Sequence, residues 1–275
     1  MSAKFYYITF LLLLATHCGT AQLDSSGNGS FVLSKYIKAD IVDFTVDNLG
    51  NIYLISKDNL LKKLDANGDS AAVFNEVSRY GNIWSIDVTN PLKILIYYKD
   101  FATIVVVDRF LNIRTTIDLR SQNILQAKAI GLGYDNNIWV YDELDAKLKR
   151  LRDDGSLVDQ TTDFRQIFDT VPDPSIIADQ SGLVYLYDIN RGVFAFDHYG
   201  GFKTTLPLTG WQDFTVIDKI LLGRDQSKFY RYQLGTLNLE EIPIPPAYLG
   251  AIKIKITPGA IYVLKKKGLE IYSRR

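Results

Sequence analysis

Short apolar runs separated by polar turns recur along this 275-residue chain. From Asp43 to Asp69 the sequence reads DFTVDNLGNIYLISKDNLLKKLDANGD, and apolar runs at Phe44–Val46, Ile52–Ile55 and Leu60–Leu64 are separated by turn residues. A sheet this small cannot bury both of its faces by itself. The pattern therefore predicts an array of repeated small sheets.

The second strand of this unit returns five more times. Consecutive copies are 42, 44, 46, 36 and 41 residues apart, counted between Ile52, Ile94, Ile138, Val184, Ile220 and Ile261. Six units of about this length are typical of a six-bladed β-propeller with four strands in each blade. A fourth strand is predicted in the first five units, at Ala71–Phe74, Ile113–Asp118, Leu157–Thr161, Phe202–Leu206 and Leu237–Ile242.

The two ends of the array complement each other. The sixth unit stops at Arg275 after its third strand, whereas the strand-like run Phe31–Ile37 has no partner strands before it. An open ring would leave two exposed sheet edges, so we predict that the N-terminal strand completes the last blade. The fold class is then an all-β, six-bladed propeller, with a signal peptide over residues 1–21 and a single propeller domain over residues 22–275.

Two of the repeated motifs resemble a known family. Asp47–Leu54 (DNLGNIYL) and Leu61–Gly68 (LKKLDANG) are similar to the blade consensus of NHL-type six-bladed β-propellers. The resemblance covers Asp40–Arg275, and the chain also resembles small, signal-bearing, uncharacterised propellers of bacterial envelopes. It implies the fold and a bias towards protein or ligand binding, but no chemistry, because propellers serve many functions.

The first residues are typical of a secretory signal peptide. Lys4 precedes the apolar run Phe5–Ala15, and Gly19 and Ala21 are the small residues expected before a cleavage site. The apolar run is about half of the ~20 residues that span a bilayer, so we expect no transmembrane segment after cleavage. The predicted location is periplasmic or secreted; the alternative is a lipid anchor on Cys18, which His17 disfavours because lipidation sites prefer a small residue there.

Composition excludes several functions. Lys plus Arg and Asp plus Glu both number 31, so nothing favours nucleic acid as a partner. Cleavage after Ala21 removes the single cysteine and one of the two histidines, which leaves no disulfide and no histidine cluster for a zinc site. The remaining histidine, His198, is expected to be a solvated turn residue.

An aspartate recurs at or just after the second strand in five units. The turns between second and third strands lie on the same face of a propeller as the loops between blades, and we call it the upper face. Each aspartate is expected to cap its own turn by accepting backbone N–H groups. The alternative is that two or three of them bind calcium or a cationic ligand. These residues are Asp58, Asp100, Asp142, Asp188 and Asp225.

The loops between blades add arginine and aromatic residues to the predicted upper face. This composition is enriched at the energetic centres of protein interfaces, although each aromatic ring has packing between blades as its alternative role. The candidate binding residues are Arg79, Tyr80, Arg120, Phe164, Arg165, Trp211 and Tyr248. The longest such loop, Thr162–Ser175, is expected to form one helical turn across the mouth of the channel.

Two functional hypotheses follow. The first is an exported, non-catalytic propeller that binds an envelope protein or a small ligand and needs no cofactor. The alternative is a calcium-assisted propeller hydrolase of the lactonase kind, for which the acidic turns supply ligands but no lactonase signature is present. The first is favoured.

Overall fold

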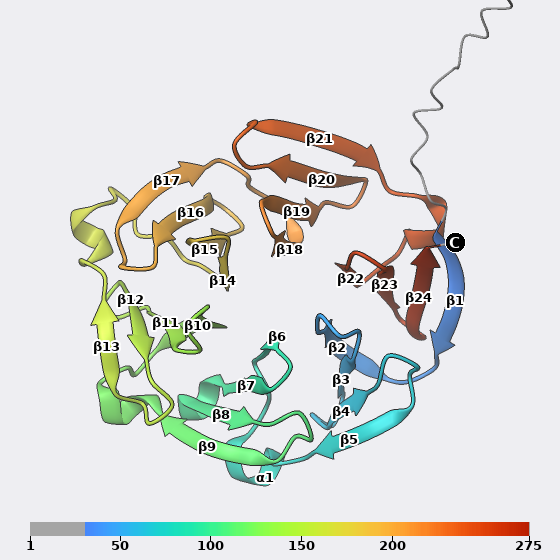
Figure 1. The fold of residues 1–275 in the computed structure, drawn as a ribbon, viewed down its shortest axis with the longest axis horizontal. Coiled ribbons are helices and arrows are strands. Elements are labelled where there is room, and N and C mark those ends of the chain that lie inside the picture. Colours follow the sequence, from blue (N-terminus) through green and yellow to red (C-terminus); the bar gives the residue numbers. More distant parts are fainter. Residues whose placement is uncertain (1–30, 275) are drawn as a thin grey trace, which may run out of the picture.

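The computed structural model describes residues 31–274 as a ring of six four-stranded antiparallel sheets around a central channel (Figure 1). In blades 1 to 5 the strands follow one another outwards from the channel in sequence order, and in blade 6 the order outwards is β22, β23, β24 and β1. Blades 1 to 3 comprise β2 (Ile41–Val46), β3 (Ile52–Ser56), β4 (Leu61–Leu64) and β5 (Ser70–Phe74); β6 (Ser85–Asn90), β7 (Lys93–Tyr98), β8 (Thr103–Val107) and β9 (Ile113–Asp118); and β10 (Ala127–Leu132), β11 (Ile138–Asp142), β12 (Lys147–Leu151) and β13 (Leu157–Gln160).

The second half of the ring repeats this arrangement, and the connections include a few short helices. Blades 4 to 6 comprise β14 (Ile176–Gln180), β15 (Leu183–Asp188), β16 (Gly192–Asp197) and β17 (Phe202–Leu206); β18 (Gln212–Ile217), β19 (Ile220–Arg224), β20 (Lys228–Gln233) and β21 (Asn238–Pro243); and β22 (Lys253–Ile256), β23 (Ala260–Lys265), β24 (Gly268–Arg274) and β1 (Phe31–Ile37). The helices are α1 (Val77–Tyr80), η1 (Lys99–Phe101), η2 (Leu119–Gln122), η3 (Phe164–Gln166) and η4 (Pro246–Tyr248).

The predicted ring closure is confirmed. β1 is the outermost strand of blade 6 and pairs antiparallel with β24, from Phe31 opposite Arg274 to Ile37 opposite Leu269. Gly268 begins β24, and a Cβ atom there would lie 2.3 Å from the carbonyl oxygen of Ile37, so the closure requires glycine at this position. The first and last described segments of the chain thus share one sheet, as Figure 1 shows at its right-hand side.

The repeated Asp-x-x-Gly motif explains the tight turns within blades. In blade 1 the carboxylate of Asp47 accepts the backbone N–H groups of Leu49 and Asn51, both at 2.9 Å. Gly50 adopts a positive φ of 81°, which glycine tolerates at no steric cost. The motif therefore fixes the register between β2 and β3. A slip of one residue would move the side chains of the strand to the opposite face of the sheet.

The hydrophobic core lies between neighbouring blades. Both faces of the middle strands are covered, and every residue of β7, β8 and β11 is buried. Tyrosine hydroxyls on three second strands also bond to the backbone of the segment that leads into the next blade: Tyr97 to Ala127, Tyr141 to Pro172 and Tyr187 to Trp211. These bonds join blades 2, 3, 4 and 5 by specific contacts in addition to apolar packing.

The long loop between blades 3 and 4 does not cross the channel mouth, so that prediction is wrong. Its helical turn, η3, places Phe164 fully inside the core between the two blades. Phe168 makes edge contacts with Phe194 and with Phe202 on the outermost strand, β17. The loop lies at the perimeter of the ring because its aromatic side chains bury more surface there than they would over an open channel (Figure 1).

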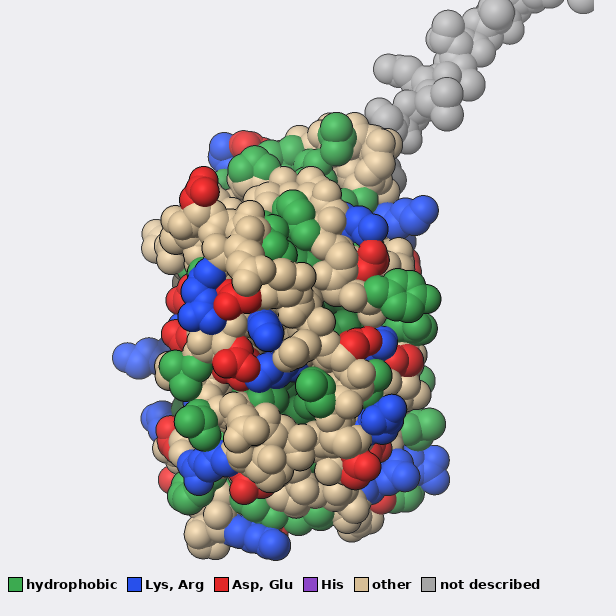
Figure 2. Space-filling view, turned by 90° about the vertical axis from the view of Figure 1, so that its left-hand side faces the viewer, with side chains coloured by type: hydrophobic (Ala, Val, Ile, Leu, Met, Phe, Trp, Pro, Cys, Tyr) green, Lys and Arg blue, Asp and Glu red, His purple; other side chains and the backbone are tan. Residues whose placement is uncertain are grey.

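The predicted signal peptide, Cys18 and the mature end at Gln22 fall outside the described residues. Within residues 31–274, no helix has the length and apolar character needed to cross a membrane. Acidic and basic side chains are mixed over the side of the ring that blades 3 and 4 form (Figure 2).

Candidate functional site in the central channel

Four of the seven residues predicted for the upper face are buried. Tyr80, Phe164, Trp211 and Tyr248 are each at most 6% exposed, so their rings pack between blades. Trp211, for example, lies parallel to Tyr230 with ring centroids 5.2 Å apart. These four aromatic residues therefore have the alternative role, packing between blades, and they are not part of an exposed binding surface.

The three predicted arginines are exposed on the upper face. Arg120 donates a hydrogen bond to the backbone carbonyl of Asp100, and Arg165 donates one to that of Asp145, both at 3.2 Å. Each of these two arginines thus braces the turn between the second and third strands of the blade that precedes it. Arg79 lies on the exposed part of α1.

The predicted aspartate ring resolves into separate turns. Asp188 accepts the backbone N–H groups of Asn190 at 2.8 Å and Asp173 at 2.9 Å, and Asp142 accepts that of Leu144 at 3.1 Å. The carboxylate of Asp225 accepts hydrogen bonds from the Tyr230 hydroxyl and from two backbone N–H groups, and these bonds hold the pKa of this carboxyl well below its usual range. Capping is confirmed for these three aspartates.

No calcium site emerges from the acidic turns. Asp58 and Asp100 are exposed at their own turns. None of the five predicted aspartates lines the central channel, and residues 31–274 contain no group of three or more His, Cys, Asp or Glu side chains placed to hold a metal ion.

His198 is not a solvated turn residue. Its Nε2 lies 2.9 Å from Oδ1 of Asp179 on the inner strand β14, and its ring stacks on Tyr134 with centroids 3.9 Å apart. Asp179 also accepts a hydrogen bond from the Trp139 indole at 3.0 Å. His198 therefore helps to fix the contact between blades 3 and 4.

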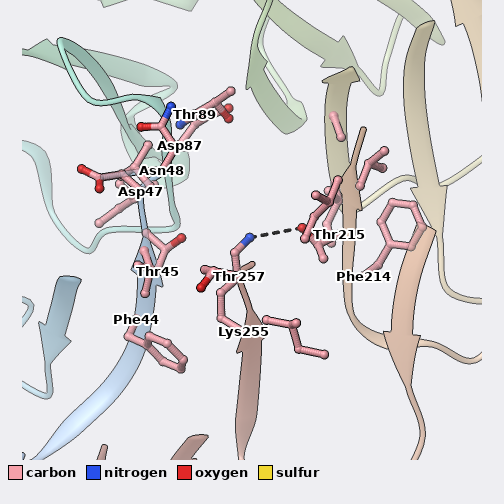
Figure 3. Close-up of a pocket in the computed structure, with 18 of the residues that line it drawn as sticks. Phe44, Thr45, Asp47, Asn48, Asp87, Thr89, Phe214, Thr215, Lys255 and Thr257 are labelled. Atoms are coloured by element: carbon pink, nitrogen blue, oxygen red, sulfur yellow. Dashed lines mark hydrogen bonds between the residues drawn. The ribbon is translucent and has the colours of Figure 1, made fainter. Parts of the chain in front are cut away.

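The principal cavity is the central channel, with a volume of about 960 Å³ (Figure 3). It is lined by the inner strands β2, β6, β10, β14, β18 and β22 together with the turns that follow several of them. This lining is rich in hydroxyl groups and also contains acidic residues and two lysines. The polar side chains include Thr45, Ser85, Thr89, Ser175, Thr215, Thr257, Asn48, Asp43, Asp47, Asp87, Asp179, Asp218, Lys253 and Lys255.

Lys255 differs from the other charged groups of the channel. It extends from β22 to β18, where its Nζ donates a hydrogen bond to Oγ1 of Thr215 at 3.2 Å (Figure 3). Among residues 31–274 it has no carboxylate within ion-pair distance. Burial lowers the pKa of Lys255, and the positive charge of Lys253 lowers it further, whereas Asp87 and Asp213 oppose these effects.

Most of the other charged side chains already have partners. Lys253, two residues earlier on the same strand, forms an ion pair with Asp43 at 2.6 Å. Asp87 accepts the backbone N–H of Leu132 in the next blade at 2.7 Å. Asp47 accepts the hydroxyl of Tyr53 at 3.0 Å. Lys255 is therefore the cationic group of the lining that has an unsatisfied charge.

Strand register places three functional groups at one depth in the channel. Each of these residues lies on the inner strand of its blade and pairs with the residue that follows the aligned isoleucine on the second strand. The pairs are Thr45 with Tyr53, Asp87 with Leu95 and Lys255 with Tyr262. By the same alignment, blades 3, 4 and 5 contribute Gly131, Ala178 and Val216 at this depth. An amine, a carboxylate and a hydroxyl from the neighbouring blades 6, 2 and 1 thus lie across the channel from a side that has no polar side chain at this depth.

The sequence analysis missed this site, although a signal was present. The segment KIKI at 253–256 alternates lysine with isoleucine in the first strand of a blade. Because side chains alternate across a strand, both lysines must lie on the same side, and only the channel end of a buried blade offers space for them.

Comparisons with known proteins support the fold. No family model matches the sequence, and no curated protein matches it. Virginiamycin B lyase from Staphylococcus aureus, in a structure of an inactive variant with quinupristin, is 12% identical with a TM-score of 0.62, covering 89% of this chain and 99% of that one. A streptogramin B lyase is 16% identical, with a TM-score of 0.60 and coverage of 90% and 87%. The WD40 domain of Neurospora crassa Pan2 is 7% identical, with a TM-score of 0.61 and coverage of 89% and 95%. The chain is thus a six-bladed propeller that resembles the virginiamycin B lyase structures, and likeness at such low identity speaks for the fold alone.

Proposed function

We propose that this protein is an exported, NHL-like propeller that binds a small polar ligand in its central channel. The carboxylate or carbonyl oxygen of this ligand accepts a hydrogen bond from Lys255. The observation that carries this proposal is that Lys255 is an amine inside a cavity without a carboxylate partner among the described residues. A buried charge without a partner is unfavourable, so a ligand oxygen that satisfies it gains free energy.

The remaining lining restricts the ligand further. A hydroxyl group such as that of Thr45 can donate a hydrogen bond to, or accept one from, a hydroxyl group of a ligand. Asp47 and Asp179 lie at the ends of β2 and β14 that point away from the upper face, so this part of the channel is acidic. A small hydroxy acid or acidic sugar, with one anionic end and several hydroxyl groups, fits both features.

The export part of the proposal depends on the N-terminal sequence. Lys4, the apolar run Phe5–Ala15 and the Gly19-Thr20-Ala21 junction support secretion to the periplasm or beyond. N-terminal sequencing of exported protein tests it: we expect Gln22 as the first residue, and a lipidated Cys18 would replace the soluble location with an anchored one.

Ligand binding is tested by calorimetry with lactate, glucuronate and inorganic phosphate as separate probes. We expect saturable binding of at least one carboxylate and its loss in Lys255→Met. Lys253→Met is the matched control, because it removes a lysine from the same strand and channel whose charge is already paired with Asp43. Absence of binding by all three probes, or equal binding by wild type and Lys255→Met, would overturn the proposal.

A partner protein on the upper face is the second candidate function. Exposed apolar side chains lie on the turns and loops of this face, which also carries the three arginines, and their removal from water would contribute to binding. They are Trp84, Phe101, Leu125, Leu144, Ile189, Leu249 and Ile252.

A further inference from the structure

The Lys255 amine has the surroundings of a nucleophile. Thr215 holds its Nζ with one hydrogen bond at 3.2 Å, and the amine faces a cavity large enough for a small molecule. Most lysines are poor nucleophiles because they are protonated at neutral pH, and a lysine becomes reactive when burial and a neighbouring cation disfavour its charged form. Both conditions hold here, since Lys255 is partly buried in the channel and Lys253 carries like charge on the same side of β22.

We propose that Lys255 binds a carbonyl ligand covalently, as a reversible imine with an aldehyde or a 2-oxo acid. This inference rests on the proposed function, since it assigns a chemical class to the ligand of the same channel. The two differ in the bond that forms. An aldehyde or a 2-oxo acid has a carbonyl carbon that the amine can attack, whereas a hydroxy acid has no such carbon and binds the amine without a covalent bond.

The reaction needs no oxidant or reductant. The lone pair of Nζ attacks the carbonyl carbon, and the electron pair of the C=O bond moves to the oxygen. A proton passes from the nitrogen to that oxygen and gives a carbinolamine. Loss of the hydroxyl group as water, with loss of the second nitrogen proton, leaves a C=N bond, so that one amine and one carbonyl yield one imine and one water.

The neighbouring groups suit these proton transfers. Asp87 of β6 lies at the same depth of the channel as Lys255 and acts on its charge, as does Asp213 of β18. Asp213 is occupied by Arg224 and by the backbone N–H of Ile254. On β2, Asp43 is engaged by Lys253. The carboxylate of Asp87 accepts two backbone N–H groups and can accept a further hydrogen bond. It is therefore the carboxylate that we assign to the proton transfers.

Another buried lysine provides an internal comparison. Burial also lowers the pKa of Lys63, but this amine donates to the backbone carbonyl of Arg109 at 2.7 Å and does not line the channel. A lysine that is only buried should react as weakly as Lys63 with a carbonyl compound added to the protein. A lysine of a ligand site should react more, and a competitor that occupies the channel should reduce this reaction.

The test uses the full mature protein, pyruvate as the probe and borohydride to reduce any imine to a stable amine. Peptide mass spectrometry then locates the adduct. At pH 7 we expect modification of Lys255 at least about tenfold above that of Lys253, whose amine is paired with Asp43, and above that of Lys63, whose amine does not line the channel. The yield at Lys255 should also reach its plateau at a lower pH than the yield at exposed lysines.

Two controls make the result decisive. Lys255→Arg keeps the positive charge but cannot form an imine, so the protein should lose the adduct and keep its melting temperature. An excess of lactate, which has the carboxylate of pyruvate but no carbonyl, should reduce the yield at Lys255 alone. Adducts spread evenly over exposed lysines, or none on Lys255, would overturn the imine, and lactate binding that persists in this case would leave the proposed function standing.

Discussion

Two tyrosines of blade 4 allow the tyrosine contacts between blades to be tested with a matched pair of substitutions. Tyr185 and Tyr187 lie two residues apart on β15, point to the same side of the sheet and belong to the same core cluster with blade 5. The hydroxyl of Tyr187 donates to the backbone carbonyl of Trp211 and accepts from its N–H, both at 2.7 Å. The hydroxyl of Tyr185 is buried and has no hydrogen-bond partner among the described residues.

The same change should therefore have opposite effects at the two positions. Tyr187→Phe leaves one buried N–H and one buried C=O of Trp211 unpaired, and each unpaired group costs about 1–3 kcal/mol, so the free energy of unfolding should fall by about 2–6 kcal/mol. Tyr185→Phe removes a polar atom that already lacks a partner, and it should leave stability unchanged or raise it by about 1 kcal/mol. Burial raises the pKa of Tyr187 to about 12, so its donated bond is present throughout the physiological range.

Urea unfolding followed by tryptophan fluorescence measures both variants against wild type. We expect the midpoint to move down for Tyr187→Phe and not for Tyr185→Phe, with similar m-values. Equal losses in the two variants would show that the ring contacts rather than the Trp211 bonds join these blades, and would refute the reasoning.

Two further predictions concern the ring and its upper face. Deletion of residues 22–37 removes β1 and exposes the edge of β24, so we expect aggregation and a lower melting temperature in size-exclusion and melting experiments; a monomer of unchanged stability would contradict the closure. Alanine at Arg79, Arg120 and Arg165 should leave the melting temperature nearly unchanged, because these side chains are exposed, but should weaken capture of any partner that docks on the upper face. Capture that survives all three changes together would exclude these arginines from the interface.

The repeat made most of the fold predictable. Turn residues such as Asp47 and Gly50 act locally, through backbone conformation and side-chain hydrogen bonds, so their sequence pattern carries the structure directly. Two fourth strands, Ile113–Asp118 and Phe202–Leu206, were predicted to the residue. Ring closure followed from a count of strands, because an unpaired edge at each end of the array is unfavourable.

The direction of loop side chains could not be predicted in the same way. Trp211 and Tyr248 lie in loops between blades, where an exposed position is expected, yet both fill space between blades. A large ring near the wedge-shaped gap between two sheets gains more by burial than by exposure, and the size of this gap depends on residues from both blades. His198 shows the same effect, since its partner Asp179 belongs to the innermost strand of its blade.

The channel site was missed because a repeat reveals the positions that all blades share, whereas a site in a propeller depends on the positions at which one blade departs from the others. At the depth of Lys255 the aligned residues of the first five blades are Thr45, Asp87, Gly131, Ala178 and Val216, and only blade 6 carries an amine. A neutral residue there would avoid the free-energy cost of burying a charge without a partner. A ligand oxygen in the channel would offset this cost, so substitution of Lys255 is the change that tests the proposed function most directly.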